Sequence, residues 1–367
     1  MLAVDFQRIT KVYHHQTVLK NISFKIEAGK FAVIFGPPGC GKSIILRLLA
    51  GLEKPTSGRI YMRGEDVTDI PPGERGIGYV PQSFALYPHY KVYDNIAYPL
   101  RLMGVHKAEL DPVVRQAAEM LRIDLLLNKF PDQLSGGEKQ RVALARGVTK
   151  KTEIFVFDDP LSGLDFKLRE QLIDDLRQMQ QSLGATFVYT TSDSLETFML
   201  AEQVHILDNG KIIEAGSLEE VYSKPMHIRT MRLLGFPEAN ILSGRLFVRE
   251  DKTWCQTSLF EFPVNLTQHD HRIEGQNVAV AVRPHDIILN PEKTNSLVEF
   301  QALIVLKEDL GGELVVHLDA EGIRLLSVVR QDDVHLLADD EITVGVQPNK
   351  MVLYSGDEGH RIGQGGN

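Results

Sequence analysis

A glycine-rich run near the amino end has the residue types and the spacing that bind phosphate groups. Residues 36–43 read GPPGCGKS, which matches G-x-x-x-x-G-K-[ST] between a predicted strand and a predicted helix. In such a loop, glycines let backbone N–H groups curl around phosphate oxygens, Lys42 reaches the β- and γ-phosphates, and Ser43 ligates Mg²⁺. The alternative is a glycine-rich turn with an incidental lysine. We predict that the loop binds a nucleoside triphosphate.

An aspartate further along the chain is a candidate ligand for the same metal ion. Asp158 closes the apolar run IFVFD at residues 154–158. A carboxylate at the carboxyl end of a strand can hold the Mg²⁺ that Ser43 also touches. Alone, an aspartate at a strand end is common. Beside the phosphate loop, we interpret Asp158 as a metal ligand.

These residues need strands and helices that bring the loop and the carboxylate to one edge of a sheet. The predicted strands are short apolar runs at residues 31–35 (FAVIF), 154–157 (IFVF) and 186–190 (TFVYT). Residues 44–50 have helical density, and residues 165–183 carry leucines and a methionine at three- and four-residue spacing, which predicts one apolar helix face. This order is typical of a mostly parallel sheet covered on both faces. We predict an α/β domain over residues 1–235.

The sequence after residue 236 has a different pattern. Short β-branched runs such as VAVAVRP, IRLLSVV and ITVGVQP are separated by Gly, Pro or Asp. This predicts an all-β domain over residues 236–356, built as a small barrel. Residues 357–367 are Gly-rich and polar, and we expect them to form a flexible tail.

Composition excludes several classes of protein. The 367 residues are 43% hydrophobic and 24% charged, which is ordinary for a globular chain of two or three domains. Because the net charge is −9, we expect no nucleic-acid partner. No apolar run approaches the roughly 18–20 residues that span a bilayer, so we expect neither a membrane-spanning nor a secreted protein. Cys40 and Cys255 show no metal-ligand spacing.

Residues 134–146 read LSGGEKQRVALAR, and this run resembles the signature of ABC transporter ATP-binding subunits. Physically it is a helix start, in which Ser135 and Glu138 form an S-x-x-E capping box while Gly136 and Gly137 leave backbone N–H groups unobstructed. The alternative is a well-capped surface helix. In this family two cassettes pack head to tail, and each signature points at the ATP held by the other subunit.

The resemblance extends to other positions and supplies roles for them. Gln82 resembles the glutamine that senses Mg²⁺ and γ-phosphate, and residues 162–165 (SGLD) resemble the D-loop, which crosses the dimer interface and ends at Asp165. Tyr13 stands where the family places an aromatic ring that stacks on adenine, although a packed strand tyrosine is an equal alternative. The resemblance thus implies ATP and Mg²⁺ as cofactors, with Ser43, Gln82 and Asp158 at the metal. The residues that it implies around ATP are Tyr13, Gly36, Pro37, Pro38, Gly39, Cys40, Gly41, Lys42, Ser43 and Ile44.

The β-rich part resembles the OB-like carboxyl-terminal domain of carbohydrate importer ATPases of the maltose, glycerol-3-phosphate and multiple-sugar type. The resemblance rests on VRPHD at residues 282–286 and LGGE at residues 311–314. It implies a peripheral subunit at the cytoplasmic face of the cell membrane. Its implied partners are a second ATPase subunit, two transmembrane permease subunits and, indirectly, an extracytoplasmic solute-binding protein.

Two positions depart from the family where water is handled. The family carries a glutamate after the metal-binding aspartate, and this chain has Asp159; the family carries a switch histidine after the third strand, and this chain has Ser192. An aspartate withdraws its oxygens by about 1.5 Å, whereas a general base must come within about 2.6–3.2 Å of its proton. Serine cannot carry the charge of an imidazolium. We therefore expect weak hydrolysis at this chain's own site.

The phosphate loop also departs from the family. Pro38 replaces a serine and removes an N–H, and Ile44 stands where a second hydroxyl contacts the α-phosphate. Cys40 lies near Lys42 and a helix start, a setting that lowers the pKa of a thiol. We expect alkylation of Cys40 to block ATP binding, with an inert small side chain as the alternative.

Three functional hypotheses follow. Because the signature LSGGE is intact, the first is a degenerate member of a heterodimeric ATPase pair in an importer. The second is a homodimer with two slow sites. The third is a nucleotide-binding regulatory or scaffold protein with little hydrolysis. A DNA-repair or translation ATPase is disfavoured by the acidic charge, the single cassette and the β-rich domain.

Overall fold

The computed structural model describes residues 1–150, 152–267, 274–292, 296–330, 339–356 and 359–366. The chain divides into two compact units, Met1–Leu218 and Glu219–Asn367. The second unit begins before the predicted boundary at residue 235, because α8 (Ile228–Leu233) packs with the β-rich part. Met231 of α8 shares a buried cluster with Ala281 and Tyr354, both of which lie far along the chain.

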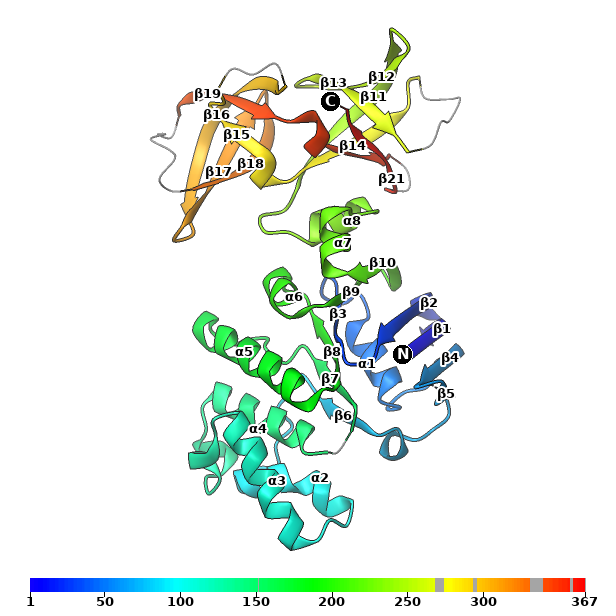
Figure 1. The fold of residues 1–367 in the computed structure, drawn as a ribbon, viewed down its shortest axis with the longest axis vertical. Helices are drawn as coiled ribbons and strands as arrows, with labels where there is room; N and C mark the ends of the chain where they lie inside the picture. The colour runs from blue at the N-terminus through cyan, green and yellow to red at the C-terminus, as the bar shows by residue number, and fades with distance from the viewer. Residues whose placement is uncertain (151, 268–273, 293–295, 331–338, 357–358, 367) are drawn as a thin grey trace. The chain divides into compact units, whose positions relative to one another are not determined.

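The first unit contains a six-stranded sheet in the order β10-β9-β3-β8-β7-β6 (Figure 1). Its strands are β3 (Phe31–Phe35), β6 (Ile77–Val80), β7 (Ile154–Asp158), β8 (Thr186–Thr191), β9 (Gln203–Asp208) and β10 (Lys211–Ser217). All neighbours pair in parallel except β9 and β10. Every residue of β3, β7 and β8 is buried, as expected for strands covered on both faces. The prediction of a mostly parallel sheet is confirmed.

Helices cover both faces of this sheet. On one face, α1 (Lys42–Leu49) packs with Ile34 and Val188 in a shared hydrophobic core. On the other lie α5 (Phe166–Leu183) and α6 (Ser194–Leu200), which pack against each other (Figure 1). The helix predicted for residues 165–183 is confirmed, with Asp165 as its N-cap.

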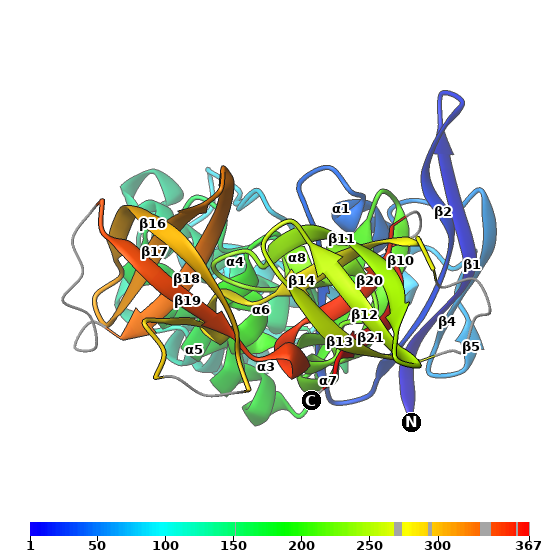
Figure 2. The same cartoon turned by 90° about the horizontal axis from the view of Figure 1, so that it is seen from above.

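An antiparallel sheet in the order β2-β1-β4-β5 completes the core of the first unit. Its strands are β1 (Leu2–Tyr13), β2 (Gln16–Glu27), β4 (Ser57–Met62) and β5 (Glu65–Asp66). Strands β1 and β2 form a long hairpin, drawn in blue in Figure 2. A helical group of α2 (Val92–Leu102), α3 (Lys107–Met120) and α4 (Gly136–Val148) packs separately from it.

The second unit begins with two short α-helices, and its other described elements are strands and short 3₁₀ turns. The two helices are α7 (Leu218–Ser223) and α8, and the first residue of α7 is the last residue of the first unit. The closed barrel has the order β11-β12-β13-β21-β20-β14, with β11 (Asn240–Arg249), β12 (Lys252–Thr257), β13 (Glu261–Leu266), β14 (Asn277–Val282), β20 (Val352–Ser355) and β21 (Arg361–Gly365). The second sheet has the order β15-β19-β16-β17-β18, with β15 (Ile287–Leu289), β16 (Val298–Asp309), β17 (Glu313–Ala320), β18 (Ile323–Arg330) and β19 (Glu341–Val346). The prediction of an all-β barrel domain is confirmed.

The expectation of a flexible tail is wrong for residues 361–365. They form β21, which pairs with β13 and β20 and closes the barrel. The glycines serve close packing there, because a Cβ at Gly365 would lie 1.9 Å from the carbonyl oxygen of Pro348. Ile362 packs against the core of the unit.

No helix among the described residues is long and apolar enough to cross a membrane.

Candidate functional site

The phosphate loop connects the end of β3 to the start of α1, and its shape depends on glycine. Gly39 and Gly41 have φ angles of 78° and 112°, a left-handed region that other residues avoid. A Cβ at Gly36 would lie 2.1 Å from the carbonyl oxygen of Leu207. The loop is therefore a tight, glycine-dependent turn directly before a helix, which is the geometry that receives a phosphate group.

Lys42 places its ammonium group over this loop. Its Nζ donates to the carbonyl oxygens of Gly36, at 2.6 Å, and Pro37, at 3.0 Å, and the side chain is buried. No side chain of the described residues caps the start of α1, and its first turn holds no acidic residue. The positive end of the helix and the ammonium group thus face the same space, which favours an anion.

The strand-end carboxylate lies beside the loop, as the sequence predicts. Ser43 Oγ donates to Asp158 Oδ1 at 2.8 Å, and Thr190 Oγ1 donates to the same oxygen at 3.1 Å. Tyr79 donates to Asp158 Oδ2 at 3.4 Å, and burial together with Asp158 raises the pKa of Tyr79 far above its ordinary value. A hydroxyl and a carboxylate oxygen at this separation fit a hard cation that takes its remaining ligands from phosphate and water.

A cleft of about 320 Å³ brings the phosphate loop together with Asp159 and Ser192, the two residues that differ from the family pattern. The residues that line it are Pro38, Gly39, Gly41, Lys42, Ser43, Ile44, Gln82, Asp159 and Ser192. They come from the loop after β3, from the first turn of α1 and from the segments that follow β6, β7 and β8. Residues more than 150 positions apart thus share one cleft at the carboxyl edge of a parallel sheet, where α/β folds bind ligands.

Asp159 is held from both sides in this cleft. Its φ angle is 44°, and its backbone N–H donates to Thr190 Oγ1 at 3.0 Å. Gln82 Nε2 donates to Asp159 Oδ2 at 3.2 Å and to Ser162 Oγ at 3.4 Å. Burial raises the pKa of the Asp159 carboxyl, and Lys42 opposes this shift. The hydrogen bond from Gln82 therefore fixes the orientation of the Asp159 side chain.

The signature run begins α4, and the capping box predicted for it is present. Ser135 Oγ accepts from the Glu138 N–H at 3.2 Å, and Glu138 Oε2 accepts from the Ser135 N–H at 2.7 Å. The Ser135 N–H lowers the pKa of Glu138. A Cβ at Gly137 would lie 2.1 Å from Leu168 Cδ2, whereas one at Gly136 would meet no described atom within 4 Å. Packing within the chain explains Gly137 but not Gly136.

The other predicted site residues lie outside the lining of this cleft. The Tyr13 hydroxyl donates to Glu53, and the Lys11 ammonium lies 4.8 Å from the Tyr13 ring centroid. Burial and Glu53 raise the pKa of Tyr13 to about 12. Asp165 accepts from the Leu168 N–H at 3.0 Å and caps α5. Stacking on adenine and a role across a dimer stay predictions for these two residues.

The expectation of a lowered thiol pKa at Cys40 is wrong. Cys40 is buried, and this burial raises the pKa of its thiol against the opposing effect of Lys42. The side chain points into protein, because a Cβ at Gly36 would lie 3.0 Å from Cys40 Sγ. Desolvation outweighs the nearby positive charge.

Three residues that support the site were not predicted. Thr190 lies opposite Asp158 in the parallel register of β7 and β8, so a strand pairing would have identified it. Arg146, near the end of α4, donates to the carbonyl oxygens of Phe84 and Ala85 in the segment after Gln82. Arg169 contacts the D-loop and the loop after β8. Such long-range contacts leave no local signal in the sequence.

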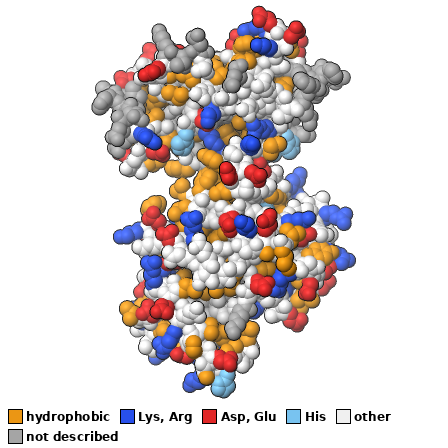
Figure 3. All heavy atoms as spheres, in the orientation of Figure 1, with side chains coloured by type: hydrophobic (Ala, Val, Ile, Leu, Met, Phe, Trp, Pro, Cys, Tyr) orange, Lys and Arg blue, Asp and Glu red, His pale blue; other side chains and the backbone are white. Residues whose placement is uncertain are grey.

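Charged side chains of both signs are interspersed on the visible face of the first unit (Figure 3). Lys and Arg form no continuous area on the part of that face that is described (Figure 3). A nucleic-acid backbone needs a basic stripe or patch.

Comparison with known proteins places both units in families. The family model described as ABC transporter matches residues 19–162, and the TOBE domain model matches residues 280–353. The maltose/maltodextrin import ATP-binding protein MalK of Vibrio vulnificus is 34% identical over 362 residues, covering 97% of this chain and 96% of the relative. The trehalose/maltose import ATP-binding protein MalK of Thermococcus litoralis is 35% identical over 347 residues, covering 90% and 92%.

Solved structures agree with the cassette part. The dimeric ATP-binding cassette MJ0796, in a post-hydrolysis state bound to ADP and Pi, matches with a TM-score of 0.54 and 29% identity. The match covers 59% of this chain and 98% of that chain. The phosphate loop, the strand-end aspartate, the capped signature helix and the β-rich second unit lead to the same conclusion as the relatives. The chain belongs to the ABC transporter ATPases, in the group of import ATP-binding proteins with a carboxyl-terminal TOBE domain.

Proposed function

We propose that this chain is the ATP-binding subunit of an importer, in which binding and hydrolysis of Mg-ATP at a head-to-tail dimer drive uptake of a solute. The observation that carries the proposal is the cleft that joins the phosphate loop to Gln82, Asp159 and Ser192. The open face of Gly136 supports the dimer, because no described atom of this chain needs a glycine there.

The solute class that we propose is a carbohydrate, a polyol or a glycerol-type compound. Support comes from the relatives, whose names specify maltose, maltodextrin and trehalose import. Such a subunit works at the cytoplasmic face of the cell membrane with two permease subunits, and indirectly with an extracytoplasmic solute-binding protein. The identity of the solute is set by those partners.

The chain's own residues bind and orient the nucleotide. The loop N–H groups and Lys42 hold the phosphates, and the ammonium exchanges two neutral carbonyl acceptors for anionic phosphate oxygens, which bind it more strongly. Ser43 Oγ and Asp158 Oδ1 would hold Mg²⁺. When bound, this ion would neutralise charge on the β- and γ-phosphates. Gln82 lines the same cleft and would contact the γ-phosphate end of the nucleotide.

The positions that handle water are the weak part of the site. Asp159 is a carbon shorter than the family's glutamate, and its carboxylate is bonded to Gln82. A base that does not reach the attacking water cannot take its proton. Ser192 lies in the cleft but cannot become a cation. We propose that this site binds ATP and hydrolyses it slowly.

An intact signature beside a weakened site favours a heterodimer. In a head-to-tail pair, residues 135–138 would complete the partner's nucleotide site, while this chain's own nucleotide site would hydrolyse ATP only slowly. We propose that this chain is the degenerate member and that its partner is a different ATPase subunit. The alternative is a homodimer with two slow sites.

A co-expression experiment distinguishes the two assemblies. Tagged full-length chain is purified together with a candidate second ATPase subunit, and ATP-dependent association is measured by sedimentation. Preferential pairing with a partner that carries glutamate and histidine at the two altered positions supports the heterodimer. Stable ATP-dependent pairing of two identical copies, unaffected by that partner, overturns it. If the chain binds no ATP in equilibrium dialysis, the nucleotide-binding function itself is refuted.

A further inference from the structure

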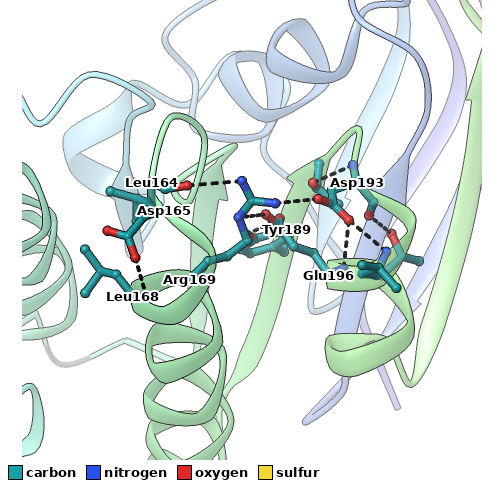
Figure 4. A network of polar contacts seen from close by, with 10 residues as sticks. Leu164, Asp165, Leu168, Arg169, Tyr189, Asp193 and Glu196 are labelled. Atoms are coloured by element: carbon teal, nitrogen blue, oxygen red, sulfur yellow. Dashed lines mark hydrogen bonds and ion pairs between the residues drawn. The ribbon is translucent and has the colours of Figure 1, made fainter. Parts of the chain in front are cut away.

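One arginine joins the two segments that frame the nucleotide cleft (Figure 4). Arg169, in the first turns of α5, donates from Nη2 to the carbonyl oxygen of Leu164 in the D-loop at 3.2 Å. From Nη1 it donates to Asp193 Oδ2, in the loop between β8 and α6, at 2.7 Å. A single planar group therefore links residues that are 29 positions apart in the sequence.

The Asp193 end of this link fixes the position of Ser192. The other carboxylate oxygen of Asp193 accepts from the N–H groups of Leu195 and Glu196, at 2.8 and 3.3 Å, and caps α6. The backbone N–H of Asp193 donates to Thr191 Oγ1 at 3.0 Å. Ser192 therefore lies between the end of β8 and Asp193, whose carboxylate accepts a hydrogen bond from Arg169.

At Leu164, the link from Arg169 reaches the D-loop, which the proposed function places at the dimer interface. Leu164 directly precedes Asp165, whose side chain caps α5 and whose carbonyl oxygen accepts from the Arg169 N–H at 3.0 Å. Ser162, at the start of the D-loop, is bonded to Gln82. The D-loop is therefore anchored at its first residue to the cleft and at its end to Arg169.

A buried pair beneath the arginine keeps its guanidinium in place. Glu196 Oε1 lies 3.7 Å from Arg169 Nε, and Nε has no hydrogen-bond partner among the described residues. The Tyr189 hydroxyl donates to Glu196 Oε2 at 2.7 Å, and both side chains are buried. Asp193 attracts the guanidinium from the cap of α6 and Glu196 attracts it from the first turn of the same helix, so both carboxylates hold it beside the loop that carries Ser192.

We propose that Arg169 is a positioning residue that couples the D-loop to the loop carrying Ser192. Movement of the D-loop on dimer closure then moves Ser192 within the nucleotide cleft, and nucleotide binding near Ser192 is felt at the D-loop. Because packed elements have discrete arrangements, a rigid link between them transmits a small displacement. This inference rests on the proposed function, since it gives the D-loop its role across the dimer.

Three variants separate coupling from simple stability. Arg169→Met keeps the length of the apolar stem and removes both hydrogen bonds. Arg169→Lys keeps the charge, but one ammonium group lacks the planar fork that reaches two loops at once. Arg177→Met is the matched control, because Arg177 is exposed on the same helix.

The measurement is amide hydrogen exchange of the full-length chain, with and without Mg-ATP. In the unmodified chain, we expect Mg-ATP to slow exchange both in the peptide that contains Ser192 and in the D-loop peptide. In Arg169→Met, the change at Ser192 persists and the change in the D-loop is lost. Arg169→Lys loses most of the D-loop change, and Arg177→Met retains it.

A purely structural role gives a different result. It would lower the unfolding temperature and speed exchange throughout α5, while the ATP-dependent difference in the D-loop persists. That result, or an unmodified chain whose D-loop does not respond to bound ATP, overturns the inference and leaves the proposed function intact. Failure of the unmodified chain to bind ATP refutes the proposed function instead. If Arg169→Met does not fold, Arg169→Lys alone decides the question by the same comparison.

Discussion

The two signature glycines, although adjacent, are expected to respond oppositely to alanine. At Gly137 the new Cβ would lie 2.1 Å from Leu168 Cδ2 and 3.1 Å from Leu168 Cγ, so the leucine must move. Overpacking of this kind costs about 1–3 kcal/mol, while replacing glycine in a helix returns up to about 1 kcal/mol. We therefore expect Gly137→Ala to destabilise the first unit by up to about 2 kcal/mol net, which lowers its unfolding temperature by up to about 8 °C.

At Gly136 the added methyl group meets no described atom within 4 Å, so only the helix-propensity gain applies. We expect Gly136→Ala to raise the unfolding temperature by up to about 4 °C. In the head-to-tail dimer that we propose, the same methyl would project toward the nucleotide of a partner subunit. This variant should therefore be at least as stable as the unmodified chain and defective in ATP-dependent pairing.

Scanning calorimetry of the full-length chain measures stability, and sedimentation velocity with Mg-ATP measures pairing. The pair of variants is its own control, because the two changes are chemically identical and adjacent. Equal unfolding temperatures for both variants would refute the packing explanation of Gly137. Normal ATP-dependent pairing of Gly136→Ala would refute the placement of a partner's nucleotide over this face.

Three further outcomes are expected. Because folding raises the pKa of Asp159, the charged carboxylate destabilises the folded chain at pH values above the raised pKa. Asp159→Asn should therefore raise the unfolding temperature at neutral pH. Calorimetry should show that this increase in unfolding temperature vanishes as the pH falls below 3.8, where the carboxyl is protonated in both states. Since burial raises the thiol pKa, Cys40 should react with iodoacetamide more slowly than free cysteine at pH 7.5, and bound ATP should slow it further, as mass spectrometry would detect. Gly365→Val should place a side chain against Pro348 and lower the unfolding temperature of the second unit. The control is Gly311→Val, because Gly311 lies in open space on a left-handed turn; in hydrogen exchange this change should affect only the β16–β17 hairpin.

The central sheet and its helices were predictable because their signals are local. Strands β3, β7 and β8 are continuous apolar runs, and α5 repeats its apolar residues at the helical period. The antiparallel sheet was not predicted. Strand β1 pairs with β2 through several register shifts, and these irregularities break the alternation that marks a half-buried strand.

The carboxyl-terminal strand shows where composition misleads. Residues 361–365 (RIGQG) look like a disordered segment, yet each glycine fits a site where another backbone approaches closely. Pairing with β13 and β20 satisfies their backbone groups. Whether a glycine confers freedom or close approach depends on residues far away in the sequence, here Asn265 and Pro348.

The candidate site was predictable wherever one motif carries it. The phosphate loop, Asp158 and the capping box lie where the sequence places them. What the sequence could not provide is the set of contacts between motifs, such as Gln82 on Asp159. The thiol pKa of Cys40 was misjudged for a related reason, because burial is a property of the whole fold.

The rate of Mg-ATP hydrolysis by the purified chain shows directly whether Asp159 and Ser192 leave the site a poor catalyst. The unmodified chain is compared with the double variant Asp159→Glu/Ser192→His, and Asp174→Glu, an exposed change on α5, serves as the control. A restored general base is worth about 10²–10⁴-fold, so we expect the unmodified chain to bind ATP and to hydrolyse it at least roughly 100-fold more slowly than the double variant. Equal, rapid hydrolysis by the unmodified chain and the double variant would contradict the account of a site that binds ATP but handles water poorly.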